Sequence, residues 1–263
     1  MYQKPNAPLS AGGVIDDASK LYRAAFRRCA PIAVLGALVS VAFELFIVGY
    51  SQHAGLPLTG LDALLKTYQE PPVMALSLLQ TVILLALFGA MILTMNAAAS
   101  AEARLSVGRA LRLGFSRLGR CVIAALVSSV MIVLGLLLLL VPGIYLSGAL
   151  ALWPVALYVD DAGGLQSLDV SRKMIHGHWW HASAALGIAV LIVLAFSLIA
   201  GFVAGVVELT ISGEAGESLV QFISAAADVI MLPMLPAALV ALYNDLKLRQ
   251  RRVTAAQGTG PTP

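Results

Sequence analysis

Long apolar runs alternate with short polar segments along the chain, and the lengths of the runs indicate the architecture. Most of the runs approach the roughly 20 residues that an α-helix needs to cross the hydrocarbon core of a bilayer. The pattern predicts six transmembrane helices, at residues 31–50, 73–98, 121–141, 144–159, 182–207 and 219–243. We therefore expect an all-α polytopic membrane helix bundle, with residues 1–250 forming a single integral membrane domain and residues 251–263 a disordered cytoplasmic tail.

The fourth of these runs is shorter than the ~17–25 residues usual for a membrane span. It follows directly on Pro142 and Gly143. Proline does not continue a preceding helix, and glycine tolerates a reversal of the chain. The sequence therefore predicts a transmembrane hairpin whose tight turn lies at Pro142 and Gly143.

Lysine and arginine are distributed unevenly between the two sides of the six-span arrangement. Sixteen of the seventeen basic residues fall on one side, and only Lys66 falls on the other. Because basic residues collect in cytoplasmic loops, both termini are predicted to be cytoplasmic. The net charge of +3 is spread over segments next to the spans, so it indicates topology and not nucleic-acid binding.

Composition agrees with a membrane protein. Hydrophobic residues make up 59% of the chain, charged residues make up 12%, and the mean hydropathy is +0.88. These values lie well outside the usual range of soluble domains. The first apolar run begins only near Pro31, after a polar N-terminus, so we expect no cleaved signal peptide.

Three of the basic segments have apolar residues at helical spacing, which predicts amphipathic helices lying in the membrane interface. They are residues 12–31, 102–121 and 163–182, and each precedes a pair of expected spans. The pattern indicates a degenerate threefold unit, with one interfacial helix followed by two transmembrane helices.

The second amphipathic segment carries our first candidates for contact with lipid headgroups, Arg109, Arg112 and Arg120. Arginines in the headgroup layer attract anionic lipids with ~1 kcal/mol per basic residue. The partners expected from this pattern are membrane lipids, in particular anionic headgroups of the inner leaflet. The alternative is that the basic helices only fix the orientation of the protein and cap the bundle.

The segment around the expected hairpin resembles a known family. It contains a leucine-rich span, Val-Pro-Gly-Ile, a span that ends in two aspartates, a glycine, and the pattern Ser-x-x-x-Ser-x-x-Met. Over residues 141–180 this arrangement resembles the YciC-like (UPF0259) bacterial inner-membrane proteins. It is similar, more distantly, to the membrane domain of some glycerophosphodiester phosphodiesterases. The resemblance implies a multi-pass inner-membrane protein connected with envelope or lipid homeostasis, and it transfers no catalytic residue.

Two acids stand inside apolar runs, Glu44 in the first span and Asp228 in the last. Ionisable residues within spans mark bundle interiors, ion paths or proton relays. Gln80 and Asn96 of the second span are the expected hydrogen-bond partners. The interpretations left open are a transport role and a buried structural acid.

Three other patterns concern packing within the bundle. Pro233 and Pro236 are expected to kink the last span just after Asp228. Gly201 and Gly205 form a G-x-x-x-G pair, which favours close internal helix packing over dimerisation. The cysteines, Cys29 and Cys121, are expected to be packed free thiols in a reducing compartment.

The histidines His176, His178 and His181 stand close enough in sequence to suggest a metal site. They lie beside Trp179 and Trp180, however, and amphipathic rings are common at membrane interfaces. We therefore expect no metal and no cofactor.

The chain contains no phosphate-binding loop, no G-x-S-x-G elbow and no H-E-x-x-H motif, so no enzymatic constellation is visible. The leading hypothesis is a non-enzymatic inner-membrane protein that interacts with lipids or helps to organise the envelope. The alternative is a small-solute or lipid transporter that uses Glu44 and Asp228. A second copy of the chain or another membrane protein is a further candidate partner.

Overall fold

The computed structural model describes residues 2–55, 61–100, 105–211 and 213–258. Within these ranges the chain is α-helical and contains no strand. The helices are α1 (Ala11–Ala54), α2 (Leu61–Gln69), α3 (Pro71–Ala99), α4 (Val107–Ser116), α5 (Leu118–Leu138), α6 (Leu140–Leu150), α7 (Trp153–Val159), α8 (Gly164–Ile175), α9 (Trp179–Thr210), α10 (Glu214–Met231) and α11 (Met234–Gly258).

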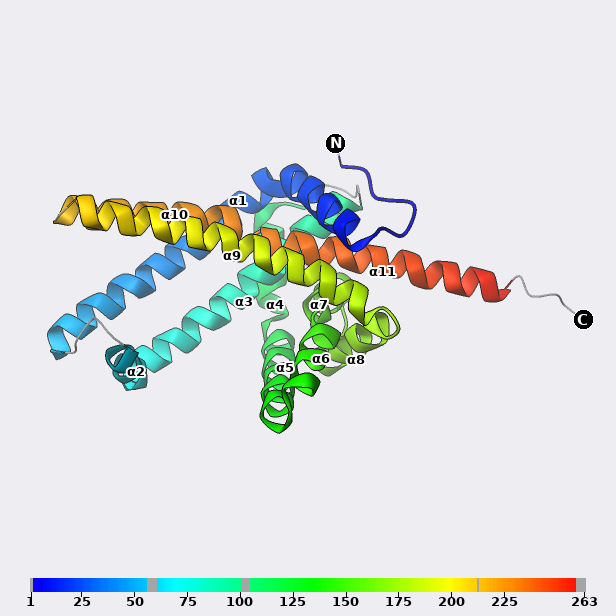
Figure 1. Cartoon of the computed structure of the whole chain (residues 1–263), viewed down its shortest axis with the longest axis horizontal. Coiled ribbons are helices and arrows are strands. Elements are labelled where there is room, and N and C mark those ends of the chain that lie inside the picture. Colours follow the sequence, from blue (N-terminus) through cyan, green and yellow to red (C-terminus); the bar gives the residue numbers. More distant parts are fainter. Residues whose placement is uncertain (1, 56–60, 101–104, 212, 259–263) are drawn as a thin grey trace, which may run out of the picture.

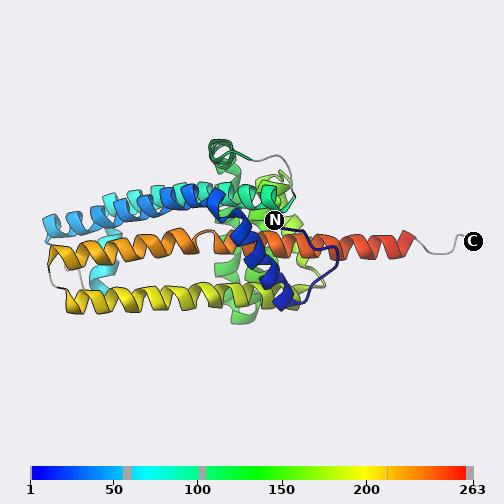
Figure 2. The same ribbon diagram turned by 90° about the horizontal axis from the view of Figure 1, so that it is seen from above.

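Six stretches of helix in this part of the chain are long and apolar enough to cross a membrane, which confirms the all-α polytopic fold. They are α1, α3, α5, α6 with α7, α9, and α10 with α11. The amphipathic segment at the N-terminus and the first span form one continuous helix, α1, which contains Pro31. Figure 2 shows that α1 bends between these two parts, as proline inside a helix predicts.

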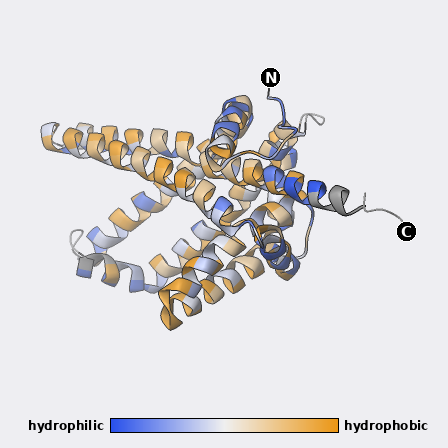
Figure 3. Cartoon of the chain, turned by 45° about the vertical axis from the view of Figure 1, so that its right-hand side comes forward, coloured by the Kyte–Doolittle hydropathy of each residue, from blue (hydrophilic) through white to orange (hydrophobic). Residues whose placement is uncertain are grey.

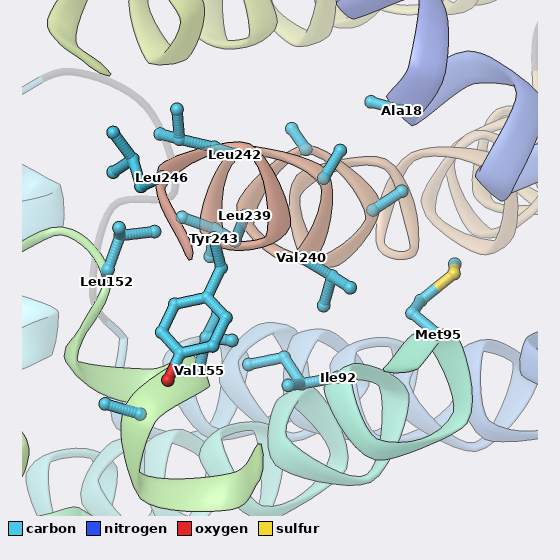
Figure 4. Packing of buried hydrophobic residues seen from close by; sticks show 14 of the residues in the cluster. Ala18, Ile92, Met95, Leu152, Val155, Leu239, Val240, Leu242, Tyr243 and Leu246 are labelled. Atoms are coloured by element: carbon cyan, nitrogen blue, oxygen red, sulfur yellow. The ribbon is translucent and has the colours of Figure 1, made fainter. Parts of the chain in front are cut away.

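The first half of α11 forms the centre of the structure. Every residue from Ala237 to Leu246 is buried, and the segment is apolar except for Asn244 and Asp245. Figure 4 shows Val240 and Tyr243 of α11 directed toward Ile92 of α3 and Val155 of α7. We call residues 237–246 the hub. The cysteines, Cys29 and Cys121, belong to the same core as buried free thiols, as the sequence predicts.

Three helical hairpins extend from the hub, formed by α1 and α3, by α5 and α6, and by α9 and α10 (Figure 1). The hairpins splay apart, and in Figure 1 α5 and α6 extend downward while the other two hairpins extend to the left. An amphipathic helix precedes each hairpin, namely the first part of α1, α4 and α8. This order matches the threefold unit expected from the sequence.

The polar ends of the chain lie on the side of the molecule from which the hairpins diverge, which we call the hub end. In Figure 3 hydrophilic residues colour the N-terminal segment and the outer part of α11, whereas hydrophobic residues dominate the hairpins. The helix α11 continues through residues 251–258, which had been expected to form a disordered tail, while residues 259–263 lie outside the described residues.

The hairpin between α5 and α6 reverses at Leu139, which has an extended backbone with φ −161° and ψ 137°. Pro142 and Gly143 lie in the first turn of α6, so the expected turn at these two residues is wrong. Proline is tolerated in a first turn because its missing N–H would have no partner within the helix there. Gly143 serves close packing, since a Cβ atom added to it would lie 2.6 Å from the backbone nitrogen of Leu136.

The short fourth span consists of α6 and α7, which together cover Leu140–Val159 and are separated at Ala151 and Leu152. Ser171 of α8 binds both sides of this break. Its hydroxyl donates to the carbonyl oxygen of Ala149 at 2.9 Å and accepts from the backbone nitrogen of Leu152 at 3.1 Å. Backbone groups freed by the break therefore have a side-chain partner.

The last span is broken between α10 and α11, which confirms the effect expected of Pro233. The hydroxyl of Tyr22 donates to the carbonyl oxygen of Ile230 at 2.9 Å, next to the break. The pair Gly201 and Gly205 does not pack internally, because a Cβ atom added to either would meet nothing within 4 Å. The prediction of close internal packing at this pair is therefore wrong.

Candidate functional site

The helix α4 is held against α3 through its small residues. Ala110 and Gly114 are buried, and a Cβ atom added to Gly114 would lie 2.5 Å from the carbonyl oxygen of Ala86 in α3. The side chain of Ser106 caps the helix by accepting from the backbone nitrogen of Arg109 at 3.3 Å. Contact with α3 therefore fixes which face of α4 points outward.

The outward face of α4 carries Arg109 and Arg112, both of which are exposed. Neither guanidinium forms an ion pair with any residue that the structure describes. The large apolar side chain of Phe115 is exposed on the same helix. Cationic and aromatic groups thus lie side by side on a rigid surface, which is the chemistry of helices that lie on membranes.

The third headgroup candidate, Arg120, has a partner within the protein. Its Nη1 atom lies 3.1 Å from Oδ1 of Asp161, and Arg117 lies 3.2 Å from the same oxygen. Arg117 also donates to the carbonyl oxygen of Tyr158 at 2.7 Å. The structure therefore groups Arg120 with Asp161 and not with Arg109 and Arg112.

The neighbouring aspartate, Asp160, attaches the end of α7 to α11. It accepts hydrogen bonds from the hydroxyl of Tyr243 and from Nζ of Lys247, the latter at 2.7 Å. The two acids that end the fourth span thus bind two different helices. Sequence reasoning noted these acids at the end of an apolar run but missed both sets of partners, because their basic partners lie far away in the chain.

The two intramembrane acids lie near each other. The helices α1 and α10, which carry Glu44 and Asp228, pack together. A Cβ atom added to Gly36 of α1 would lie 3.1 Å from Leu232, one turn beyond Asp228. Because α1 and α10 run antiparallel, this register places Glu44 and Asp228 about one helical turn apart in depth.

Two amides, Gln80 and Asn96, are expected to form hydrogen bonds to these acids. Only Gln80 lies at a similar depth in the bundle to Glu44. Gly36 of α1 also faces Leu84 of α3, and the two helices run antiparallel (Figure 1). This register places Gln80 within about one turn of the level of Glu44. Asn96 lies sixteen residues farther along α3, or about 24 Å at 1.5 Å per residue. Neither amide forms a hydrogen bond to either acid in the described part of the chain.

A buried polar network that sequence reasoning missed lies at the C-terminal end of the hub. The carboxylate of Asp245, whose side chain is only 2% exposed, accepts from Nε of Arg249 at 2.8 Å and contacts Nε2 of His181 at 2.9 Å. It also accepts from the backbone nitrogen of Leu9 at 2.6 Å. The sequence does contain one signal for this network, the polar pair Asn244 and Asp245 at the end of an apolar run.

This network also holds the N-terminal segment against α11. Arg249 donates to the carbonyl oxygen of Leu9, and the hydroxyl of Tyr2 donates to Asp17 at 2.8 Å. Burial, together with the nearby Asp17 carboxylate, raises the pKa of the Tyr2 phenol above its ordinary range. Tyr2 therefore remains a hydrogen-bond donor at neutral pH.

The three clustered histidines do not share one ligand face. His181 faces Asp245, whereas His176 is exposed and His178 precedes α9. Within the ranges that the structure covers, no group of three His, Cys, Asp or Glu side chains is arranged to hold a metal ion.

Two hollows meet at Trp179. An open apolar cleft of about 520 Å³ lies between α6, α7, α9 and α11, and a more polar hollow of about 570 Å³ lies at the start of α9. Trp179 lines both, stacks on Tyr145 with a centroid distance of 5.7 Å and donates to its carbonyl oxygen at 3.0 Å. The two hollows therefore adjoin.

Comparison with known proteins gives one short match. Over 83 residues the chain is 41% identical to a UPF0259 membrane protein of Photorhabdus laumondii subsp. laumondii, and the aligned region covers 32% of each chain. The match thus spans about a third of the length of that relative. No family model and no solved structure matches the chain.

Nothing in these comparisons supports the expected similarity to glycerophosphodiester phosphodiesterases. The UPF0259 resemblance is supported over the aligned third, and the helices long enough to span a membrane extend through the rest of the described chain. The protein is therefore a multi-pass membrane protein that is similar, over a third of its length, to a member of the uncharacterised UPF0259 family.

Proposed function

We propose that this protein is a non-enzymatic protein of the bacterial inner membrane whose helix α4 binds the anionic headgroups of inner-leaflet lipids and so helps to organise the envelope membrane. The observation that carries this proposal is the pair Arg109 and Arg112, exposed and without an ionic partner among the described residues. Phe115, exposed beside them, supports insertion of this surface among lipid chains.

The proposal places the hub end in the cytoplasm. The basic residues of α4, α8 and the end of α11 belong to this end of the molecule, and basic residues of short loops are retained on the cytoplasmic side. The inner leaflet is negatively charged, so each exposed arginine that lies against it, as we propose for α4, is attracted by ~1 kcal/mol, whereas the outer end of α11 extends away from the hairpins (Figure 1). Arg120 contributes less in this account, because Asp161 already neutralises part of its charge.

The test is retention of phosphatidylglycerol by purified protein, measured by native mass spectrometry after extraction from nanodiscs that contain phosphatidylglycerol and phosphatidylethanolamine. In the variant R109Q/R112Q we expect loss of ~2 kcal/mol of attraction, or roughly a 30-fold weaker association with phosphatidylglycerol. The matched control is R251Q/R252Q, which removes two exposed arginines from α11. Equal retention in both variants, or equal loss in both, contradicts the proposal.

A second candidate function, a small-solute or lipid carrier, is favoured by the proximity of Glu44 and Asp228. Paired acids at one depth of a membrane bundle are typical of proton or cation paths. If this function holds, Asp228→Asn abolishes a pH-dependent flux in proteoliposomes while the variant remains folded. A change in thermal stability without a change in flux assigns the acid a structural role.

A further inference from the structure

We propose that the two hollows that meet at Trp179 form one binding site for a single phospholipid, with an acyl chain in the apolar cleft and the phosphate in the polar hollow. This inference rests on the proposed interaction with lipids but concerns a different place in the molecule. It lies between the second and third hairpins, whereas α4 packs on α3 of the first.

The apolar cleft has the shape and lining required for a lipid tail. It is bounded by α6 and α7 on one side and by α9 and α11 on the other, and its lining is mostly apolar. Phe88, Leu186, Val190 and Leu239 are among the lining residues. Its volume of about 520 Å³ falls in the range typical of small-molecule sites. The hairpins splay apart (Figure 1), and in this proposal the lipid enters the open cleft sideways from the bilayer.

A glycine in α6 allows two polar side chains to lie at the inner wall of the cleft. A Cβ atom added to Gly148 would lie 2.7 Å from Nε1 of Trp179 and 2.8 Å from the hydroxyl oxygen of Ser183. The hydroxyl of Ser183 is buried and has no hydrogen-bond partner among the described residues. Buried hydroxyl groups are usually paired, so this donor is available to an ester or phosphate oxygen of a ligand.

The polar hollow supplies the cationic and hydrogen-bonding chemistry that a phosphate needs. It is lined by His176, His178, His181 and Arg249, together with Tyr145, Trp179 and Trp180. Of the described residues, the acid paired with these groups is Asp245, which lies behind Arg249 and His181 and orients both. The N–H groups of arginine and histidine side chains that face a hollow are suited to phosphate oxygens.

The occupant that fits both hollows together is amphiphilic and bears a phosphate. A soluble anion would leave the apolar cleft unused, and a neutral hydrocarbon would leave the polar groups around Arg249 unused. A phospholipid entering sideways from the inner leaflet satisfies both. Trp179, which lines both hollows, would then lie at the boundary between headgroup and chain, where indole rings are favoured.

The decisive variant fills the cleft from α9. Gly187 lines the cleft, and a Cβ atom added there would meet nothing within 4 Å, so Gly187→Leu occupies the lipid path without a clash against the protein. Gly201→Leu is the matched control, because Gly201 lies in the same helix, is equally unhindered and does not line the cleft. Both changes replace a helical glycine, so their effects on helix stability should be equal.

The readout is photo-crosslinking with phosphatidylglycerol that carries a diazirine in one acyl chain, followed by peptide mapping. We expect wild-type protein and Gly201→Leu to be labelled in α6 and α9 around the cleft, and Gly187→Leu to lose this labelling. Val190→Trp is a second blocking variant, in case Gly187→Leu folds poorly. Unchanged labelling in both blocking variants overturns the inference.

Two further arms separate this site from other outcomes. A diacylglycerol probe with the same chains should not label the cleft, and equal labelling by both probes would mean that the polar hollow does not select a phosphate. The variant R109Q/R112Q should keep the cleft label. If the α4 variant loses phosphatidylglycerol while Gly187→Leu changes nothing, the proposed function stands and the cleft site fails.

Discussion

His181 at the start of α9 and Asp245 of α11 are joined across 2.9 Å, from Nε2 to Oδ2, and this contact closes the hub beside the N-terminal segment. Arg249 and the backbone of Leu9 bind the same carboxylate. A single buried side chain therefore holds three parts of the chain that are distant in sequence. Removing it tests whether the hub is the structural centre of the protein.

We predict that Asp245→Ala destabilises the protein by about 3–5 kcal/mol, because removing one partner of a buried ion pair leaves the other charge uncompensated. Thermal unfolding in detergent, followed by circular dichroism, measures the effect. The control is Asp169→Ala, which removes an exposed pair with Lys173 at 2.6 Å and should cost less than about 1 kcal/mol. Similar losses in the two variants would argue against a central role for the network.

The crossing of α5 and α6 depends on Gly143. We predict that Gly143→Ala costs about 1–3 kcal/mol, because the added methyl group overpacks a contact with the backbone of α5. Pro142→Ala should have a much smaller effect, since the proline lies in the first turn of α6 and not in the reversal. Comparing the unfolding temperatures of the two variants decides the matter. A larger loss of stability for Pro142→Ala than for Gly143→Ala would instead support a turn at Pro142 and Gly143.

Ser171 should matter because it binds both backbone groups at the break between α6 and α7. Ser171→Ala leaves a buried N–H and a buried carbonyl without this partner, and we expect a loss of about 1–3 kcal/mol. Ser147→Ala is the control, since the exposed hydroxyl of Ser147 bonds only within its own helix, at 2.8 Å from the carbonyl of Ile144. An equal and small effect of both changes would show that the break needs no support from α8.

We expect Glu44 and Asp228 to be energetically coupled, because they lie on the packed helices α1 and α10, about one helical turn apart in depth. We predict that Glu44→Gln and Asp228→Asn are non-additive in a double-mutant cycle, with a coupling of about 0.5–3 kcal/mol in unfolding free energy. Neutralising either acid removes the same repulsion, so the second substitution gains little. Additive effects in the cycle would mean that the two acids act independently.

The sequence predicted what depends on local pattern. Run length located the spans, the amphipathic stripes identified α4 and α8, and Pro233 marked the break before α11, because hydropathy, periodicity and proline act within one segment. Pro142 and Gly143 show the limit of this reasoning. Proline and glycine are as typical of a helix start and a close helix crossing as of a turn, and only the neighbouring helix distinguishes these roles.

The candidate site was harder to predict from the sequence, because it depends on which helices are neighbours. Arg120 forms an ion pair with Asp161 and is therefore not a free arginine. Glu44 and Asp228 lie on helices that pack together although they are far apart in the sequence. Periodicity assigns a face to each residue but does not say what that face contacts. For the same reason the network around Asp245 and the adjoining hollows at Trp179 had no signal beyond a few polar residues near an apolar run.

The most direct test of the central claim records what touches α4 in a membrane. Phe115→p-benzoylphenylalanine places a photoreactive group on the exposed face beside Arg112, and irradiation in membranes of mixed phosphatidylglycerol and phosphatidylethanolamine attaches the neighbouring lipid. We predict adducts enriched in phosphatidylglycerol beyond its share of the membrane, with the enrichment lost when Arg109→Gln and Arg112→Gln are added. Adducts that follow the bulk lipid composition, attachment to protein in place of lipid, or no adduct at all would contradict the account.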